Sequence, residues 1–542
     1  MKRNTFGILC ICICIALMSS LFVACGNTEN NNAGGTESAK IDTTAAESSQ
    51  AGEMLPVYPV KTTEKLTYLL FLSGSVTSHF TNLSETPYAK ELQKRTGIEV
   101  EYINPTDTDQ FNVMVASGDL PDLISWSWET YYPGGATKAL SDGVIKPLND
   151  YMKDYAPNYS AYLAANEDIN KGVKTSEGQY LYFPAVDAGN AMYGPLLRKD
   201  WLDDLGLKVP ETVDEWYEVL KAFKDKKGAI APFTNHSPKD YAFIVGAYGV
   251  KGNFFLQDGK VKYGPAEENY KSYLQTLIKF YNEGLIDKDI ATVDGKLKAA
   301  RITSGQSGAT MGYPSSFITY TAGGIEKDPK FSLAPAPYPV LNKGEKPQFA
   351  NVSLPYILAT QGVAISTKCK NPELACRLMD YNYSEEGQLL SNFGIEGETY
   401  TVEADGTFKF TDKVLKNPDG WSMFDMLGAY ALSYASGPYV RHPALTKAQL
   451  TLPIQYEASQ IWSDTDALKH EVPPIRPNAI ETELMNRIMA DVRVYQDEMF
   501  LKFLFGDESI DNFSKYIEQM KALGIDRVLE IQQQAYDVYL TK

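Results

Sequence analysis

The chain has 542 residues, 44% hydrophobic and 22% charged; this suits two large lobes or about three packed domains and excludes collagen, coiled coils and wholesale disorder. Its 51 Lys and Arg against 68 Asp and Glu give a formal net charge of −17, and so acidic a surface repels phosphate backbones, so no nucleic-acid partner is expected. Tyrosine is abundant, at 35 residues, which calls for a functional explanation.

The N-terminus has the pattern of a secretory signal. A basic start, Lys2-Arg3, precedes an apolar run, small residues and Cys25. The string LFVACG resembles the lipobox of bacterial lipoproteins, in which the cysteine becomes the first residue after cleavage and carries lipid; Phe22 stands where that motif usually has leucine. We expect a signal peptide at 1–24 and a lipid-bearing (palmitate) Cys25, with an uncleaved transmembrane anchor as the alternative.

Residues 25–61 are expected to form a flexible, lipidated tether. No aromatic residue precedes Tyr58 in this segment, and Asn, Gly, Ser, Thr and Ala dominate it. Such a segment cannot bury enough apolar surface to offset the entropy lost on ordering. About 35 residues of flexible chain reach roughly 30–35 Å. The signal and the tether together predict a bacterial protein held on the extracellular face of the cell membrane through its N-terminal lipid.

Strands and helices are predicted to alternate beyond the tether. Hydrophobic spacing predicts, in chain order, a strand at 65–72, a helix at 86–96, a strand at 98–103, a helix at 107–117 and a strand at 122–125. This alternation predicts a parallel sheet with helices on its faces and ligand-binding loops at the carboxyl ends of its strands. Further elements are predicted as a capped helix at 212–224, a helix at 266–282, a strand at 307–313, a helix from 371 and an almost wholly helical region at 480–540.

Four segments together resemble the extracellular solute-binding proteins of family 1, the oligosaccharide-binding lipoproteins of ABC importers. They are VMVASGDLPDLISW (113–126), YGPLLRKDWLDDLGLKVPETVDEWYEVLKAF (193–223), ISTKCKNPELACRLMDYNYSEEGQLLSNFGIEGETY (365–400) and FGDESIDNFSKYIEQMKALGI (505–525). The NFGIEGETY string and the final helical run are similar to the large LplA-like branch of that family. The resemblance extends over most of the mature chain.

The resemblance implies an α/β, two-lobe periplasmic-binding-protein-like fold of type II, with a hinge, a central cleft and a helical C-terminal region. It places lobe one at 62–185 and 329–400, and lobe two at 186–328 and 401–542. The implied function is that of a monomeric, lipid-anchored receptor that captures an oligosaccharide and delivers it to the permease subunits of an ABC transporter. The resemblance implies neither a cofactor nor catalysis.

The loops after two predicted strands supply candidate ligand-binding residues. A sugar needs aromatic platforms for its C–H faces and hydrogen-bonding groups for its hydroxyls. The loop after the third strand contains Trp126, Trp128 and Glu129, and the loop after the first strand contains Ser73 and Ser75. The structural alternatives are that the rings pack under their loop and that the serines form a plain tight turn.

Five more candidates come from the resemblance. Asp187, just past the first crossing, corresponds to a cleft carboxylate of related sugar binders. Tyr313, with Ser315, occupies the lobe-two loop where the family places a stacking aromatic residue. Trp421 and Trp462 lie in the last portion of the chain, which supplies further aromatic residues in related proteins.

No metal site is expected. Related proteins carry a calcium loop after the helix that begins at residue 212, but here the stretch 224–230 has a single carboxylate, and calcium needs about six to eight oxygen ligands. Cys369 and Cys376 remain after signal removal, and their spacing favours two reduced, structural thiols over a disulfide.

Two other function classes stay open. The first is a receptor of the same fold for a peptide or another solute, because fold does not decide between ligands. The second, less favoured, is a secreted polysaccharide hydrolase, whose paired carboxylates a sequence would not reveal. The sequence has no P-loop, no H-E-x-x-H and no G-x-S-x-G motif to support catalysis.

Overall fold

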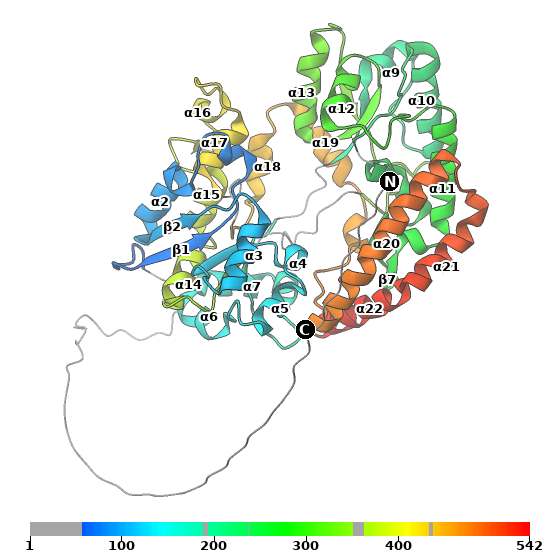
Figure 1. Cartoon of the computed structure of the whole chain (residues 1–542). Coiled ribbons are helices and arrows are strands. Elements are labelled where there is room, and N and C mark those ends of the chain that lie inside the picture. Colours follow the sequence, from blue (N-terminus) through cyan, green and yellow to red (C-terminus); the bar gives the residue numbers. More distant parts are fainter. Residues whose placement is uncertain (1–56, 188–192, 237, 351–361, 433–436) are drawn as a thin grey trace, which may run out of the picture. The chain divides into compact units, whose positions relative to one another are not determined.

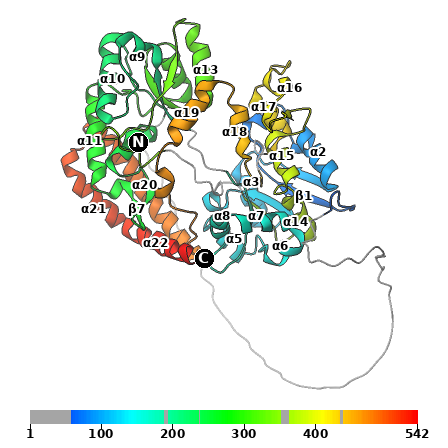
Figure 2. The same ribbon diagram turned by 180° about the vertical axis from the view of Figure 1, so that it is seen from behind.

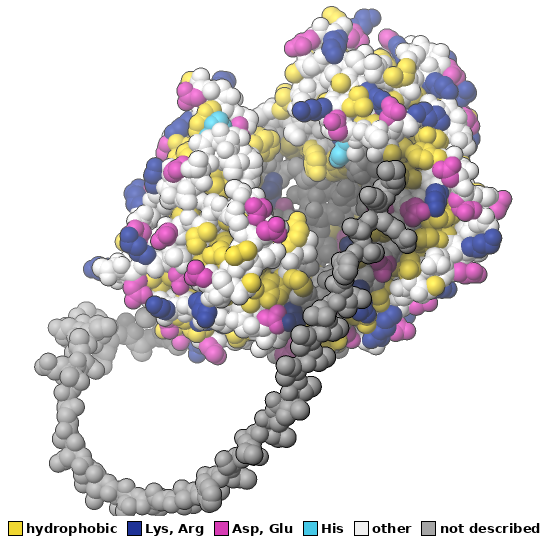
Figure 3. Space-filling view, in the orientation of Figure 1, with side chains coloured by type: hydrophobic (Ala, Val, Ile, Leu, Met, Phe, Trp, Pro, Cys, Tyr) yellow, Lys and Arg dark blue, Asp and Glu magenta, His cyan; other side chains and the backbone are white. Residues whose placement is uncertain are grey.

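The structure is a computed structural model that describes residues 57–187, 193–236, 238–350, 362–432 and 437–542. The expected signal peptide, Cys25 and most of the expected tether lie outside the described residues. Within the part of the chain that is described, no helix has both the length and the hydropathy of a membrane span. Side chains of both charge signs are interspersed over the face seen in Figure 3.

Five strands form the first sheet, in the order β2-β1-β3-β10-β4. The strands are β1 (Lys65–Leu69), β2 (Glu99–Ile103), β3 (Leu123–Trp126), β4 (Phe183–Pro184) and β10 (Gly362–Ile365). The first three are parallel, and β10 runs antiparallel to β3 and β4. Helices α2 (Pro87–Thr96) and α3 (Thr108–Ser117) connect the parallel strands, as parallel pairing requires. The predicted alternation of elements between 65 and 125 is confirmed.

Local chemistry defines both ends of α2. The Thr86 side chain accepts a hydrogen bond from the backbone N–H of Ala89 at 3.2 Å, and Pro87 occupies the first helical position. Gly97 ends the helix with a φ of 74°, and a Cβ atom there would lie 2.4 Å from the carbonyl oxygen of Val60. Only glycine fits this position, because both the left-handed backbone and the close contact exclude a side chain.

A second sheet of three antiparallel strands, in the order β8-β5-β9, has a core of its own. Its strands are β5 (Gly194–Arg198), β8 (Ala309–Gly312) and β9 (Leu333–Pro335). The predicted helical C-terminal region is confirmed as α20 (Ala479–Phe505), α21 (Phe513–Leu523) and α22 (Ile525–Thr541). Helix α20 packs against α11 (Asn269–Asn282), and α22 packs against α20 and β7 (Lys260–Tyr263), as the orange, red and green ribbons of Figure 1 show.

The remaining elements surround these two sheets. The helices of the first half are α1 (Gly74–Thr77), η1 (Leu83–Glu85), α4 (Trp128–Tyr131), α5 (Gly135–Ser141), α6 (Asn149–Tyr155), α7 (Pro157–Ala165), α8 (Glu167–Val173), α9 (Lys199–Leu205), α10 (Val213–Lys227), η2 (Pro238–Tyr248) and η3 (Gly264–Ala266). Those of the second half are α12 (Gly295–Thr303), α13 (Pro314–Ile325), α14 (Pro372–Tyr381), α15 (Glu385–Phe393), α16 (Asp412–Leu415), α17 (Met423–Tyr430), α18 (Pro443–Gln449), α19 (Pro453–Ser463), η5 (Ala467–His470) and η6 (Ile510–Asn512). Two hairpins pair β6 (Phe254–Gln257) with β7, and β11 (Tyr400–Val402) with β12 (Phe408–Phe410).

The segment after residue 400 packs differently from the expectation. Helix α17 contacts α1, α2 and α15, and Leu432 and Val440 belong to the core of the first sheet. Beyond residue 400, the described chain contributes to the core of the second sheet from α19 onward, and α19 packs on α13 and β9. The packing therefore differs from the expected start of the last lobe-two segment at residue 401. It also differs from the expected return to lobe one at residue 329, because β9 and Phe349 belong to the second sheet and its core. We propose boundaries beyond residues 440 and 350 instead.

The two cysteines of the described chain, Cys369 and Cys376, are buried free thiols. Burial raises the pKa of the Cys369 thiol to about 12 and also raises that of Cys376. Both thiols therefore stay protonated at neutral pH and act as small apolar side chains in the core.

A buried carboxyl group should make folding stability depend on pH. Asp380 of α14 lies beneath α7, where it accepts hydrogen bonds from the backbone N–H of Tyr159 at 2.8 Å and from Asn158 Nδ2 at 2.7 Å; Figure 2 shows α6, α7 and α14 together. Burial raises its pKa to about 6, although these hydrogen bonds oppose the rise.

The folded state therefore binds a proton at pH values where the unfolded carboxyl has lost it. The stabilisation is complete below pH 4 and is lost as the pH rises through about 6. We expect the free energy of unfolding to fall by on the order of 2–3 kcal/mol between pH 4 and pH 7 from this group. Urea unfolding at both pH values checks this: Asp380→Asn should remove that decrease and Asp412→Asn, on an exposed side chain, should keep it. If the free energy of unfolding of Asp380→Asn still fell between pH 4 and pH 7 as it does in the wild type, the assignment of this pH dependence to Asp380 would be contradicted.

Candidate functional site

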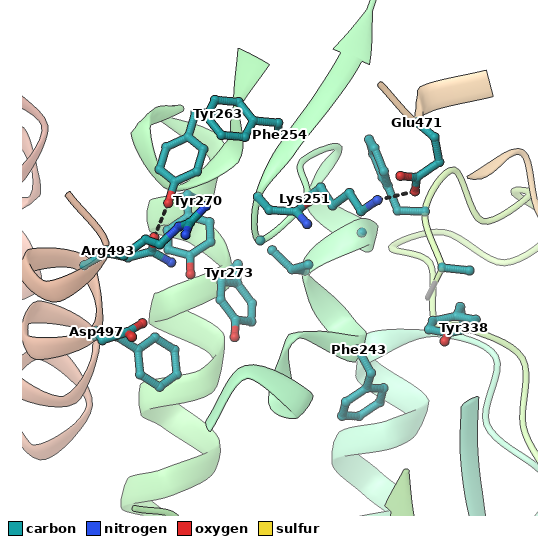
Figure 4. Close-up of a pocket in the computed structure, with 18 of the residues that line it drawn as sticks. Phe243, Lys251, Phe254, Tyr263, Tyr270, Tyr273, Tyr338, Glu471, Arg493 and Asp497 are labelled. Carbon is teal, nitrogen blue, oxygen red and sulfur yellow. Dashed lines mark hydrogen bonds and ion pairs between the residues drawn. The ribbon is translucent and has the colours of Figure 1, made fainter. Parts of the chain in front are cut away.

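A pocket of about 700 Å³ lies among the β6–β7 hairpin, α11 and α20, and Figure 4 shows it in close-up. Its aromatic lining consists of Tyr193, Phe243, Phe254, Tyr263, Tyr270, Tyr273, Tyr338, Phe349 and Phe500. Its charged lining consists of Lys251, Glu471, Arg493 and Asp497. Pockets of this size and composition are typical of small-molecule sites.

A tight hairpin positions two of the rings. Asp258 and Gly259 have φ values of 52° and 73°, which fit the two central positions of a type I′ turn. The turn sets Phe254 directly opposite Tyr263 in the antiparallel register, with ring centroids 4.8 Å apart. The Tyr263 hydroxyl donates to the side-chain oxygen of Gln496, so the hairpin is joined to α20.

Helical spacing arranges the other two walls. Tyr270 and Tyr273 lie three residues apart on α11, with ring centroids 5.1 Å apart. Arg493, Gln496 and Phe500 follow at intervals of three and four residues on one face of α20. Burial raises the pKa of both α11 tyrosines, so their hydroxyls stay protonated and can donate hydrogen bonds at neutral pH.

The charged groups of the pocket differ in their partners. Lys251 and Glu471 form an ion pair. Arg493 has neither an ion pair nor a hydrogen bond to any described residue, and in Figure 4 its side chain extends from α20 toward Tyr270. The Tyr273 hydroxyl is buried and has no hydrogen-bond partner among the described residues. The pocket thus offers ring faces together with donors that a polar ligand could satisfy.

Three of the sequence-predicted aromatic residues are core residues. Trp126, Trp128 and Trp462 are 3%, 1% and 0% exposed. The Trp128 indole N–H donates to the Gly362 carbonyl at 2.9 Å, and that of Trp462 lies 3.1 Å from the carbonyl oxygen of Ala336. The expectation that these indoles form open platforms is corrected: α4 and α5 fold the loop back onto β3, and strand β5 lies against Trp462.

Glu129, Ser73 and Ser75 lie where they contact other parts of the protein. Glu129 forms an ion pair with Arg476. Ser73 immediately precedes α1 and Ser75 lies within it, and α1 packs closely on α17. Trp421, half-buried just before α17, stacks on His79 with ring centroids 3.7 Å apart, so one of its two faces is occupied.

The remaining predicted residues are Asp187, Tyr313 and Ser315. The Asp187 carboxylate is 3.7 Å from Arg441 Nε. Tyr313 is 57% exposed and its ring centroid is 4.7 Å from that of Tyr193. Because Tyr193 lines the pocket, Tyr313 is the predicted residue that the structure links most directly to it. Ser315 is exposed on the first turn of α13.

Sequence reasoning missed the main pocket residues. Phe254, Tyr263, Tyr270 and Arg493 come from four elements, and Tyr263 and its partner Gln496 are 233 positions apart. The signal that the sequence offered was its high tyrosine content, 35 residues.

The chain is similar to known binding proteins. The sequence profile of the family described as bacterial extracellular solute-binding protein matches residues 81–389. Lipoprotein LipO of Bacillus subtilis is 28% identical over 364 residues, covering 63% of this chain and 70% of LipO. The fructooligosaccharide ABC transporter substrate-binding protein FusA of Streptococcus pneumoniae is 24% identical, covering 73% of this chain and 72% of FusA. The crystal structure of the alginate-binding protein AlgQ2 without calcium is 27% identical, with a TM-score of 0.72, over 88% of this chain and 99% of that one.

Proposed function

Because the chain belongs to the bacterial extracellular solute-binding proteins, we propose that it is a receptor that captures an oligosaccharide and delivers it to an ABC transporter. It has the two-lobe α/β fold of solved proteins of this kind. The names of FusA, which binds fructooligosaccharides, and of AlgQ2, which binds alginate, support a carbohydrate ligand.

The observation that carries the proposal is the tyrosine-rich pocket. Flat rings such as Phe254 and Tyr270 suit the C–H faces of sugar rings, and hydroxyl, amide and guanidinium groups suit their hydroxyls. The cavity of about 700 Å³ can hold a short oligosaccharide rather than a single small ion. We further propose that Ser73, Ser75, Asp187, Tyr313, Ser315 and Trp421 contribute at the cleft between the lobes.

The finer features of the receptor are also proposals. Cys25 carries the lipid that holds a monomer on the extracellular face of the membrane, permease subunits receive the ligand, and the glycan leaves unchanged. The N-terminal pattern supports the anchor, and the similarity to binding proteins supports the absence of turnover.

Phe254→Ala is expected to weaken oligosaccharide binding about tenfold or more, because loss of one stacking ring in comparable base–aromatic contacts costs about 1–3 kcal/mol. Phe254 is half-buried on the hairpin and lines the pocket. Isothermal titration calorimetry against a glycan panel measures the change. Tyr456→Ala is the matched control, because that ring is 51% exposed and does not line the pocket.

Two results would contradict the proposed function. One is tight binding to peptides with no binding to any glycan, and the other is release of shortened glycans after incubation. Equal affinities of wild type and Phe254→Ala, with unchanged melting temperatures, would show that the sugar binds elsewhere.

A further inference from the structure

We infer that the pocket recognises an acidic sugar residue and that Arg493 binds its carboxylate; the inference rests on the proposed function. The ligand class is thus narrowed from oligosaccharides in general to those carrying a uronate or a similar carboxylate.

The charged groups of the pocket differ in their ion pairing. Lys251 is neutralised by Glu471, and both side chains are mostly buried, at 17% and 14% exposure. Arg493 has no such ion-pair partner among the described residues; the Asp497 carboxylate lies one helical turn further along α20 and also lines the pocket. Asp497 has an interaction of its own, and within the described residues it forms no ion pair with Arg493.

A guanidinium that has no ion-pair partner limits which ligands can fill the pocket it lines. A ligand that fills the pocket displaces water from Arg493, and removing water from a charge is costly unless a partner replaces it. A hydroxyl replaces only part of the lost hydration, whereas a carboxylate accepts two parallel hydrogen bonds from the guanidinium and neutralises its charge.

The surroundings of Arg493 suit a carboxylate on a sugar ring. Its side chain extends toward Tyr270 (Figure 4), whose hydroxyl has no hydrogen bond to a described residue. A protonated phenol can donate a further hydrogen bond to the same carboxylate. The Phe254 and Tyr263 rings, 4.8 Å apart on the hairpin, supply the apolar surface beside it.

The test compares acidic oligosaccharides with their carboxyl-reduced counterparts, which keep the linkage and lose the charge. The full-length chain is titrated with oligogalacturonates, oligoalginates and sialylated oligosaccharides, each beside its reduced form. We expect at least one acidic ligand to bind about tenfold to a hundredfold more tightly than its reduced form. Arg493→Gln should abolish that difference, and its loss of affinity for the reduced form should be much smaller than its loss of affinity for the acidic form.

Asp497→Asn is the matched control. It removes a charge from the same face of α20 and should preserve or increase the preference for the acidic ligand. Because Arg493 forms no ion pair or hydrogen bond with another described residue, its variant should melt close to the wild-type temperature. Equal affinities for acidic and reduced forms, or an Arg493→Gln variant that keeps the preference, would overturn the inference and leave the proposed function intact. Failure of every glycan, acidic or neutral, to bind would overturn the proposed function itself.

Discussion

Arg476→Ala is expected to lower the free energy of unfolding by on the order of 3 kcal/mol. The substitution leaves the Glu129 carboxylate and the Tyr182 hydroxyl without their partner at a contact that is largely shielded from water. The Arg476 side chain is 7% exposed and pairs with Glu129, which is 34% exposed. Its other nitrogens donate to the Tyr182 hydroxyl and, at 2.9 Å, to the Gly172 carbonyl. Because Glu129 is partly exposed, we expect a loss of stability at the lower end of the range for breaking a buried ion pair.

This contact joins parts of the chain that are far apart in sequence. Arg476 lies in the proline-rich segment that leads into α20, and its partners belong to α4, α8 and the chain before β4. Near the other end of the C-terminal region, Lys542 Nζ donates to the Lys174 carbonyl at 2.8 Å. The helical C-terminal region is thus held to the part of the chain that surrounds the first sheet.

Guanidinium denaturation followed by circular dichroism measures the loss. Lys469→Ala is the control, because that side chain is 72% exposed and its pair with Asp466 should contribute less than about 1 kcal/mol. The double variant Arg476→Ala/Glu129→Ala should lose less than the sum of the single variants, since each single change leaves the other group unpaired. A loss below about 1 kcal/mol in Arg476→Ala would show that the contact is not formed.

The order of elements was predictable because its signals are local. Period-two alternation in β2, the Thr86 and Gly97 ends of α2 and the capping box at Thr212 and Glu215 each involve a few neighbouring residues. The structure has all of these features where the sequence predicts them.

The pocket was not predictable in the same way, because it depends on long-range packing. No local pattern predicts that the Tyr263 hydroxyl bonds to Gln496, or that Arg493 has no ion pair with another described residue. Burial of aromatic residues is likewise a tertiary property. Trp128 follows a strand end, where ligands often bind, yet its N–H is satisfied by Gly362, 234 positions away.

Trp462→Ala is expected to lower the free energy of unfolding by about 3–5 kcal/mol, the range for truncating a large buried aromatic residue. The ring is fully buried, its N–H lies 3.3 Å from the Pro195 carbonyl oxygen and 3.1 Å from that of Ala336, and Gly194 approaches its face so closely that a Cβ there would lie 2.4 Å from the indole.

A second substitution at this position, Trp462→Phe, separates a core role of the ring from the ligand-platform role expected from the sequence. Trp462→Phe keeps most of the buried ring but loses both carbonyl contacts, and should cost about 1–3 kcal/mol of stability. Its glycan affinity, measured by calorimetry at a temperature where it is fully folded, should stay within about twofold of wild type, since a core ring makes no contact with ligand. A loss of affinity comparable to that of Phe254→Ala, with little loss of stability, would restore Trp462 as a ligand platform and contradict its place in the core.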